Sequence, residues 1–176
     1  MMKSYLKLLT LSFLLLIILT LAGCPKFGQL VTPSLPDSLS GILYLDPASY
    51  NPTPGKDFTM ELKASSIEDL KGYSVLLSYD PAVLKPGEIE EGPCLAQGNK
   101  TFFWKKIDPA KGTIQIDCAI LGSELSADGE GSLATLHFTA LLSKGNTEVI
   151  FAQAQTRDTH NQPILTDQKS AQVRCK

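Results

Sequence analysis

Two histidines and two acidic loops are the side chains best suited to catalysis or metal binding in this 176-residue sequence. His137 and His160 belong to no H-E-x-x-H motif, and the chain contains no G-x-S-x-G, P-loop or G-x-G-x-x-G motif. No pair of carboxylates stands out as the acid and base of a glycosidase. The sequence therefore predicts that this protein is not an enzyme and has no catalytic residues.

The acidic loops at residues 128–130 and 158–161 contain oxygen ligands of the kind that calcium takes, six or more at a time. Neither loop has the ordered spacing of an EF-hand. Asp, Asn and Gly are also the residues that tight turns prefer. We interpret both loops as turns, and we expect no metal site and no cofactor in this chain.

Cys24 ends a segment that is typical of an export signal. Lys3 and Lys7 precede an apolar run over residues 8–21, which is too short to span a bilayer comfortably. The order Leu-Ala-Gly-Cys over residues 21–24 resembles the lipobox of bacterial lipoproteins. The resemblance implies removal of the signal peptide 1–23 and lipidation of Cys24, and two or more acyl chains give stable anchoring.

We therefore expect an exported protein that is lipid-anchored to the cell membrane or the outer membrane and faces the periplasm or the cell exterior. Pro25 follows the cysteine where a retention signal for the inner membrane would have Asp, which favours the outer membrane in a cell with two membranes. Residues 24–40 are rich in proline and have no helix or strand period, so they form a tether. The folded domain is expected over residues 41–176.

Three cysteines remain after Cys24, which is an odd number for an oxidising compartment. One disulfide and one free thiol are expected. Cys94 and Cys118 are the candidate pair, because Cys175 lies one residue from the chain end, where order is poor. Metal binding by the three cysteines is the alternative, although no C-x-x-C pair is present.

The charge balance excludes one class of partner. The formal net charge is −2, and the segment before Cys24 carries two lysines and no acidic residue, so the mature chain is more acidic than the whole. Nucleic-acid binding requires a basic face. The sequence predicts no nucleic-acid partner.

The chain beyond residue 41 consists of short alternating segments separated by turn residues. Apolar and polar residues alternate with period two over 58–65, 73–79, 114–120 and 133–142, which is typical of half-buried strands. No segment has a long helical period. Strands at these intervals predict an all-β sandwich.

Three segments in order resemble the cohesin domain family: Pro54–Thr59, the stretch 70–84 with its Tyr-Asp-Pro-x-x-Leu ending, and the Gly-x-Leu-Ala-x-Leu-x-Phe stretch 131–140. The resemblance covers about residues 41–174. It implies a nine-stranded jelly-roll β-sandwich, related to some carbohydrate-binding modules. It also implies a non-catalytic receptor for a dockerin module. Dockerins carry duplicated calcium loops, so calcium is expected on the partner rather than here.

Members of this family bind dockerin helices on one sheet face, which includes their third, fifth, sixth and eighth strands. The alternation predicts which side chains of this chain face outward there: Ser74, Leu76, Ser78, Gln115, Asp117, Ala119 and, beyond the strand, Leu121. The Ser74 position often carries an acidic residue in cellulosomal members, so the specificity of this chain differs. Leu76 between two serines suits a binding centre with a polar rim, but an ordinary exposed leucine is the equal alternative.

The stretch 101–107 carries aromatic residues in both phases of the alternation. Phe102 and Trp104 point to one side and Phe103 to the other. We expect the pair with the single tryptophan to be buried and Phe103 to be exposed. An exposed Phe103 would either anchor a partner or be covered by a neighbouring loop.

These observations favour a surface-anchored, cohesin-like receptor for a dockerin-bearing protein, in a polysaccharide-degrading system. Two alternatives stay open. One is direct binding of polysaccharide, which requires a row of exposed aromatic rings that this sequence hardly supplies. The other is a structural lipoprotein of the cell envelope.

Overall fold

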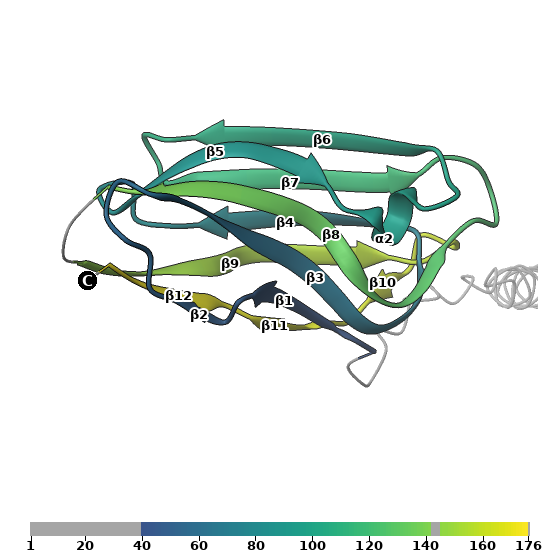
Figure 1. Ribbon diagram of the computed structural model, residues 1–176. Helices are drawn as coiled ribbons and strands as arrows, with labels where there is room; N and C mark the ends of the chain where they lie inside the picture. Colours follow the sequence, from purple (N-terminus) through teal and green to yellow (C-terminus); the bar gives the residue numbers. More distant parts are fainter. Residues whose placement is uncertain (1–39, 142–144, 176) are drawn as a thin grey trace, which may run out of the picture. The chain divides into compact units, whose positions relative to one another are not determined.

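The computed structural model describes residues 40–141 and 145–175, which form two facing β-sheets (Figure 1). The signal peptide, Cys24 and all of the tether except Ser40 lie outside the described residues. Within the described ranges, no helix has the length and apolar character needed to cross a membrane.

The first sheet has five strands in the order β11-β1-β3-β8-β5. Its strands are β11 (Asp167–Lys169), β1 (Ile42–Asp46), β3 (Asp57–Leu70), β8 (Ala127–Ala140) and β5 (Leu84–Glu91). The two longest strands, β3 and β8, have 14 residues each and pair antiparallel.

The second sheet has seven strands, in the order β2-β12-β9-β4-β7-β6 with β10 paired to β9. Its strands are β2 (Ser49–Tyr50), β12 (Ala171–Cys175), β9 (Gly145–Arg157), β4 (Gly72–Ser78), β7 (Thr113–Ile120), β6 (Thr101–Asp108) and β10 (Pro163–Ile164). The short helix α2 (Pro93–Ala96) lies between β5 and β6 in the chain. Neighbours from β9 to β6 pair antiparallel.

The predicted all-β sandwich is confirmed. The described residues form twelve strands, three more than the nine predicted, and nine of these have five or more residues. The additional strands β2, β10 and β11 have only two or three residues each. Strands β2 and β11 are too short to show an alternation in the sequence.

The core lies between the two sheets and follows the period-two alternation. In β4, Tyr73, Val75 and Leu77 are buried, whereas the residues between them face outward and are only half-buried. The hydroxyl group of Tyr73 donates a hydrogen bond to the carbonyl oxygen of Leu133 at 2.9 Å, so this buried phenol has a partner. The strands therefore form because each buries one face and solvates the other.

The side chain of Lys105 connects the two sheets at one edge of the sandwich. Strands β5 and β6 are edge strands of their respective sheets. The Nζ atom of Lys105 in β6 donates a hydrogen bond to the carbonyl oxygen of Ile89 in β5 and lies 3.7 Å from Glu88. The ammonium group thus links the two edges.

Two neighbouring leucines of β4 test this arrangement. Leu77 is fully buried, so Leu77→Ala should lower the free energy of unfolding by about 2–5 kcal/mol because it leaves a cavity. Leu76 faces outward, so Leu76→Ala should cost less than about 1 kcal/mol. Urea denaturation of both variants measures the difference, and equal losses would contradict the assignment of faces.

Candidate functional site

Four adjacent strands, β9, β4, β7 and β6, present their outward side chains as regular rows. We call this surface the outer face. The antiparallel register sets each row across the four strands: Arg157–Gly72–Ala119–Phe102, Gln155–Ser74–Asp117–Trp104, Gln153–Leu76–Gln115–Lys106 and Ile150–Ser78–Thr113–Asp108. The outer face therefore mixes apolar, polar and charged side chains on a hydrogen-bonded sheet.

A hydrogen-bond network fixes the polar side chains at the middle of the outer face. The Nε2 atom of Gln115 donates to the Oγ atom of Ser74 at 3.0 Å and to the Oδ1 atom of Asp117 at 2.8 Å. Leu76 lies beside Gln115 in the same row. Its outward neighbours along β4, Ser74 and Ser78, are half-buried polar residues. These side chains are held in place before any partner arrives.

The structure brings together five of the predicted site residues. Ser74, Leu76, Ser78, Gln115 and Asp117 all lie on the outer face, as their alternation predicts. Their role in binding stays a prediction. Leu121 is separate: it follows the end of β7, is 52% exposed and donates its N–H group to the carbonyl oxygen of Lys100 at 2.8 Å.

The predicted orientation of the aromatic residues in β6 is wrong. Phe102 and Trp104 are 54% and 42% exposed, whereas Phe103 packs against the core. The register explains the reversal, because Phe103 pairs with the inward-facing Cys118. Phe103 is therefore not available to a partner, and the two aromatic rings that sequence reasoning missed take its place on the outer face.

Alternation alone could not settle this orientation. Both phases of the strand carry phenylalanine, so burial of the single tryptophan was the only available preference. The pairing of Phe103 with Cys118 would have been the deciding signal.

The predicted disulfide between Cys94 and Cys118 is absent from the structure, in which these two cysteines and Cys175 are free thiols. The Sγ atom of Cys118 lies 3.5 Å from the Oε1 atom of Glu91, to which it donates. Burial, together with the negative charge of Glu91, raises the pKa of the Cys118 thiol to about 12. Burial also raises the pKa values of Cys94 and Cys175. These thiols are poorly suited to nucleophilic chemistry.

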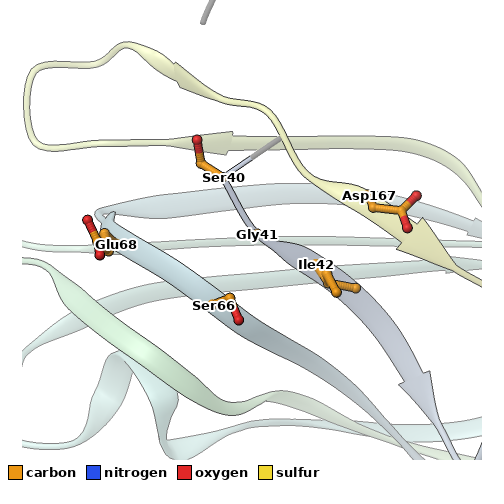
Figure 2. A pocket seen from close by; sticks show the side chains of 6 residues that line it. All are labelled: Ser40, Gly41, Ile42, Ser66, Glu68 and Asp167. Carbon is orange, nitrogen blue, oxygen red and sulfur yellow. The ribbon is translucent and has the colours of Figure 1, made fainter. Parts of the chain in front are cut away.

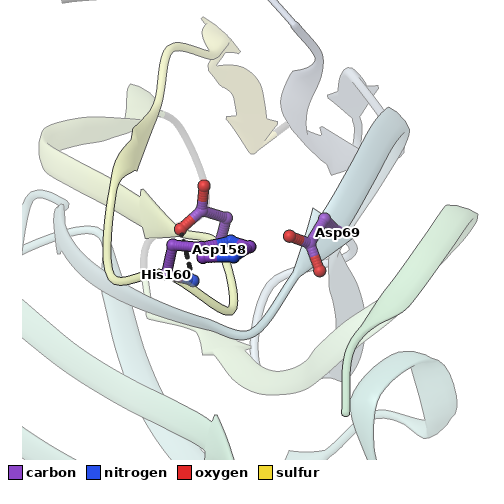
Figure 3. A group of neighbouring side chains, drawn as sticks. All are labelled: Asp69, Asp158 and His160. Atoms are coloured by element: carbon purple, nitrogen blue, oxygen red, sulfur yellow. Dashed lines mark hydrogen bonds between the residues drawn. The ribbon is translucent and has the colours of Figure 1, made fainter. Parts of the chain in front are cut away.

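A second group of side chains lies where the loop after β9 meets the end of β3. Asp69, Asp158 and His160 bring their donor atoms within 4.8 Å of one another (Figure 3). The Asp69 carboxylate accepts a hydrogen bond from the Thr159 hydroxyl at 2.8 Å, and this bond contributes most to a lowered pKa of Asp69. Sequence reasoning missed Asp69, because nothing around it signals a site.

Hydrogen bonds within the chain account for the positions of these carboxylates. The Oδ1 atom of Asp158 accepts from the N–H groups of His160 and Gln162 at 2.9 and 2.7 Å. The Oδ1 atom of Asp128 accepts from the N–H group of Asp69 at 2.6 Å. Two carboxylates and an imidazole suit a divalent cation. The bonds of Asp158 are those of a turn, whereas Asp69 is bonded to β8 and to the loop after β9.

A hollow of about 530 Å³ lies where the described chain begins. Ser40, Gly41, Ile42, Ser66, Glu68 and Asp167 line it (Figure 2). The Ser40 N–H group donates to the carbonyl oxygen of Leu165 at 2.7 Å. The Asp167 N–H group donates to the carbonyl oxygen of Gly41 at 3.0 Å. These bonds hold the first described residues against β11 and against the residues that precede it in the chain.

Comparisons with known proteins agree on one family. The family model of the cohesin domain matches residues 45–173. A search of curated proteins finds no match to this chain. Solved structures share the fold at low sequence identity. A non-cellulosomal cohesin from the archaeon Archaeoglobus fulgidus is 16% identical, with a TM-score of 0.64, over 77% of this chain and 90% of that one.

Two further solved structures are similar. A type II cohesin domain from the cellulosome of Acetivibrio cellulolyticus is 16% identical, with a TM-score of 0.66, over 76% of this chain and 95% of that one. A type I cohesin–dockerin complex from Clostridium thermocellum gives 16% identity and a TM-score of 0.65, over 80% of this chain and 97% of that one.

Thiol labelling tests the environment of Cys118. Because its pKa is raised from an ordinary 9.0 to about 12, native Cys118 should react with iodoacetamide at pH 8 about a thousandfold more slowly than in urea. Its contribution to stability is present below about pH 9 and is lost as the pH rises toward 12. Peptide mass spectrometry measures the labelling, and equal rates in both states would contradict this assignment.

Proposed function

Since the chain belongs to the cohesin domain family, we propose that its domain is a receptor that binds a dockerin-type module on the outer face. Cohesin domains are non-catalytic modules, so this chain is not an enzyme. The observation that carries the proposal is the outer face itself. Among the nine strands of five or more residues, β4, β6, β7 and β9 are the third, fifth, sixth and eighth, the positions that the family resemblance implies for binding, and they lie side by side.

The centre of the outer face has the composition of a protein-binding site. Leu76 is a half-buried apolar side chain among Gln115, Gln153 and the serines of its own strand. An apolar centre inside a polar rim excludes water from the contacts that carry most of the binding energy. This arrangement supports a functional role for Leu76 rather than incidental exposure.

An acidic residue is present although Ser74 replaces the one that is frequent in the family. Asp117 is the direct register partner of Ser74, one strand away. Gln115 donates to both side chains, so it holds the carboxylate of Asp117 beside the serine. The negative charge of this surface therefore lies on β7, at Asp117, rather than on β4, at Ser74. A complementary Lys or Arg of a partner would have to face β7.

Phe102 and Trp104 enlarge the contact area at the β6 edge. Aromatic side chains provide a large apolar surface with few rotatable bonds, so burying them in an interface costs little conformational entropy. Both rings project from the same side of β6. They extend the outer face to the edge of the sheet.

Surface attachment belongs to the same proposal. Lipidation of Cys24 would hold the domain at a membrane, and residues 25–40 could extend about 50 Å when stretched. A receptor on such a tether would retain dockerin-bearing proteins near the cell, as in a system that degrades polysaccharide. Calcium would be supplied by the partner, whose duplicated loops require it.

Direct polysaccharide binding is the second candidate function, and one observation favours it. The exposed rings of Phe102 and Trp104 are two residues apart on one strand. Two rings at this spacing form a short platform on which sugar rings can stack. The platform would be small, so the protein-binding function remains the main proposal.

Binding assays with purified dockerin modules test the main proposal. Trp104 is the single tryptophan and is 42% exposed, so a dockerin that covers it should shift its emission to the blue. Leu76→Asp should weaken binding at least about 100-fold, because a central apolar contact is lost. Calcium chelation should release the partner.

Thr59→Asp is the matched control, because Thr59 is exposed on β3 in the opposite sheet. It should leave the affinity unchanged. Failure of every dockerin module tested to bind, with retention on insoluble cellulose instead, would favour the polysaccharide function and overturn the proposal.

Fractionation of the producing cells tests the anchor. The wild-type protein should sediment with membranes and partition into detergent. Cys24→Ser should move it to the soluble fraction, because no thioether lipid can form. A variant that still sediments and partitions like the wild type would refute lipid attachment at Cys24.

A further inference from the structure

The outer face is not flat: a hollow of about 450 Å³ lies over its first row, between Phe102 and Arg157. Most of its lining comes from β4, β6, β7 and β9, and the loop at residues 158–161 completes it. The hollow is a local feature of this chain's side chains.

Two small residues form the floor of the hollow. Gly72 and Ala119 are direct register partners on β4 and β7. A Cβ atom at Gly72 would lie 2.8 Å from the carbonyl oxygen of Cys118, so a side chain at this position would force the strands to shift. The close approach of β4 and β7 therefore requires glycine at position 72, and the absence of a side chain there deepens the hollow.

Two large side chains form the walls. Phe102 is the register partner of Ala119 on the β6 side and is 54% exposed. Arg157 is the register partner of Gly72 on the β9 side, and its Nη1 atom donates to the carbonyl oxygen of Asn161 at 3.0 Å. That bond holds the guanidinium group against the loop. The aromatic wall and the alanine and glycine floor offer mostly apolar surface.

We infer that this hollow receives one large apolar side chain, of the leucine, methionine or phenylalanine class, from a helix of the partner. The inference rests on the proposed function and adds the chemistry of the partner residue. Hot-spot side chains are typically apolar anchors that fill such pockets within a polar rim. Filling the hollow would bury the exposed ring of Phe102.

Charge complementarity specifies a second feature of the same helix. Asp117 lies two residues from Ala119 on β7, a spacing of about 6.8 Å along a strand. Residues four apart on a helix are separated by about 6 Å along its axis. Asp117 also lines the hollow, so a partner helix that places an apolar residue over Ala119 would present Lys or Arg one turn away to the Asp117 carboxylate.

Small amide probes test the hollow without any dockerin. N-acetyl-leucinamide and N-acetyl-phenylalaninamide, titrated at millimolar concentration into the full chain in detergent, should shift the amide resonances of Gly72, Phe102 and Ala119. N-acetyl-glycinamide, which has no side chain, should not. Ala119→Leu fills the hollow and should abolish the shifts. Shifts that persist in this variant, or none in the wild type, would overturn the inference.

Dockerin affinity gives the second measurement. Ala119→Leu should weaken binding at least tenfold, and Asp117→Asn about fivefold with a smaller loss at high salt. Ala82→Leu is the matched control, because it makes the same substitution at an exposed residue of the turn between β4 and β5, outside the outer face. It should change affinity less than twofold.

The outcomes separate this inference from the proposed function. Equal affinities for Ala119→Leu and Ala82→Leu would overturn the role of the hollow while the receptor function stands. Occupancy of the hollow by the amide probes, with no dockerin bound by the wild type, would support the apolar pocket and overturn the dockerin as its source.

Discussion

The register between β4 and β7 is the constraint on which the outer face depends. Tyr73, Val75 and Leu77 face the core from one strand, and Ile114 and Ile116 face it from the other. A slip of one residue would place these side chains in water and turn the polar residues inward, at a cost of many kcal/mol. Burial on one side therefore fixes every neighbour relation on the other, including the Ser74–Asp117 pair.

The same alternation made much of the fold predictable from the sequence. Segments with apolar residues in one phase and polar residues in the other, such as 73–79 and 114–120, were assigned to the correct faces. The stretch 101–108 was not, because aromatic residues occupy both phases and only the partner strand decides between them. Strands β2 and β11, of two and three residues, were not predicted, because they are too short to show any period.

The parts of the site that arise from tertiary proximity were not predictable. Asp69 connects strand β8 with the loop at residues 158–161 through Asp128 and Thr159, although it is distant from both in sequence. The turn predicted at residues 128–130 is wrong, because these residues belong to β8. The small size of Gly72 and Ala119 has meaning only once the register makes them neighbours. The cysteine count suggested a disulfide from compartment alone, whereas Cys118 donates to Glu91 instead. The sequence shows that acidic, small and cysteine residues are present, but it does not show which of them become neighbours in the folded chain.

The lysine that links β5 and β6 bears on how the protein behaves among copies of itself. Edge strands expose unpaired N–H and C=O groups, and they are the places where β-proteins join into aggregates. Here Lys105 occupies the gap between the two edges, and Lys106 adds a second charge to the β6 strand. A third strand that approached this side would have to displace a bound ammonium group and bury its charge. The β6 edge is thereby guarded against pairing with a strand of another copy of the protein.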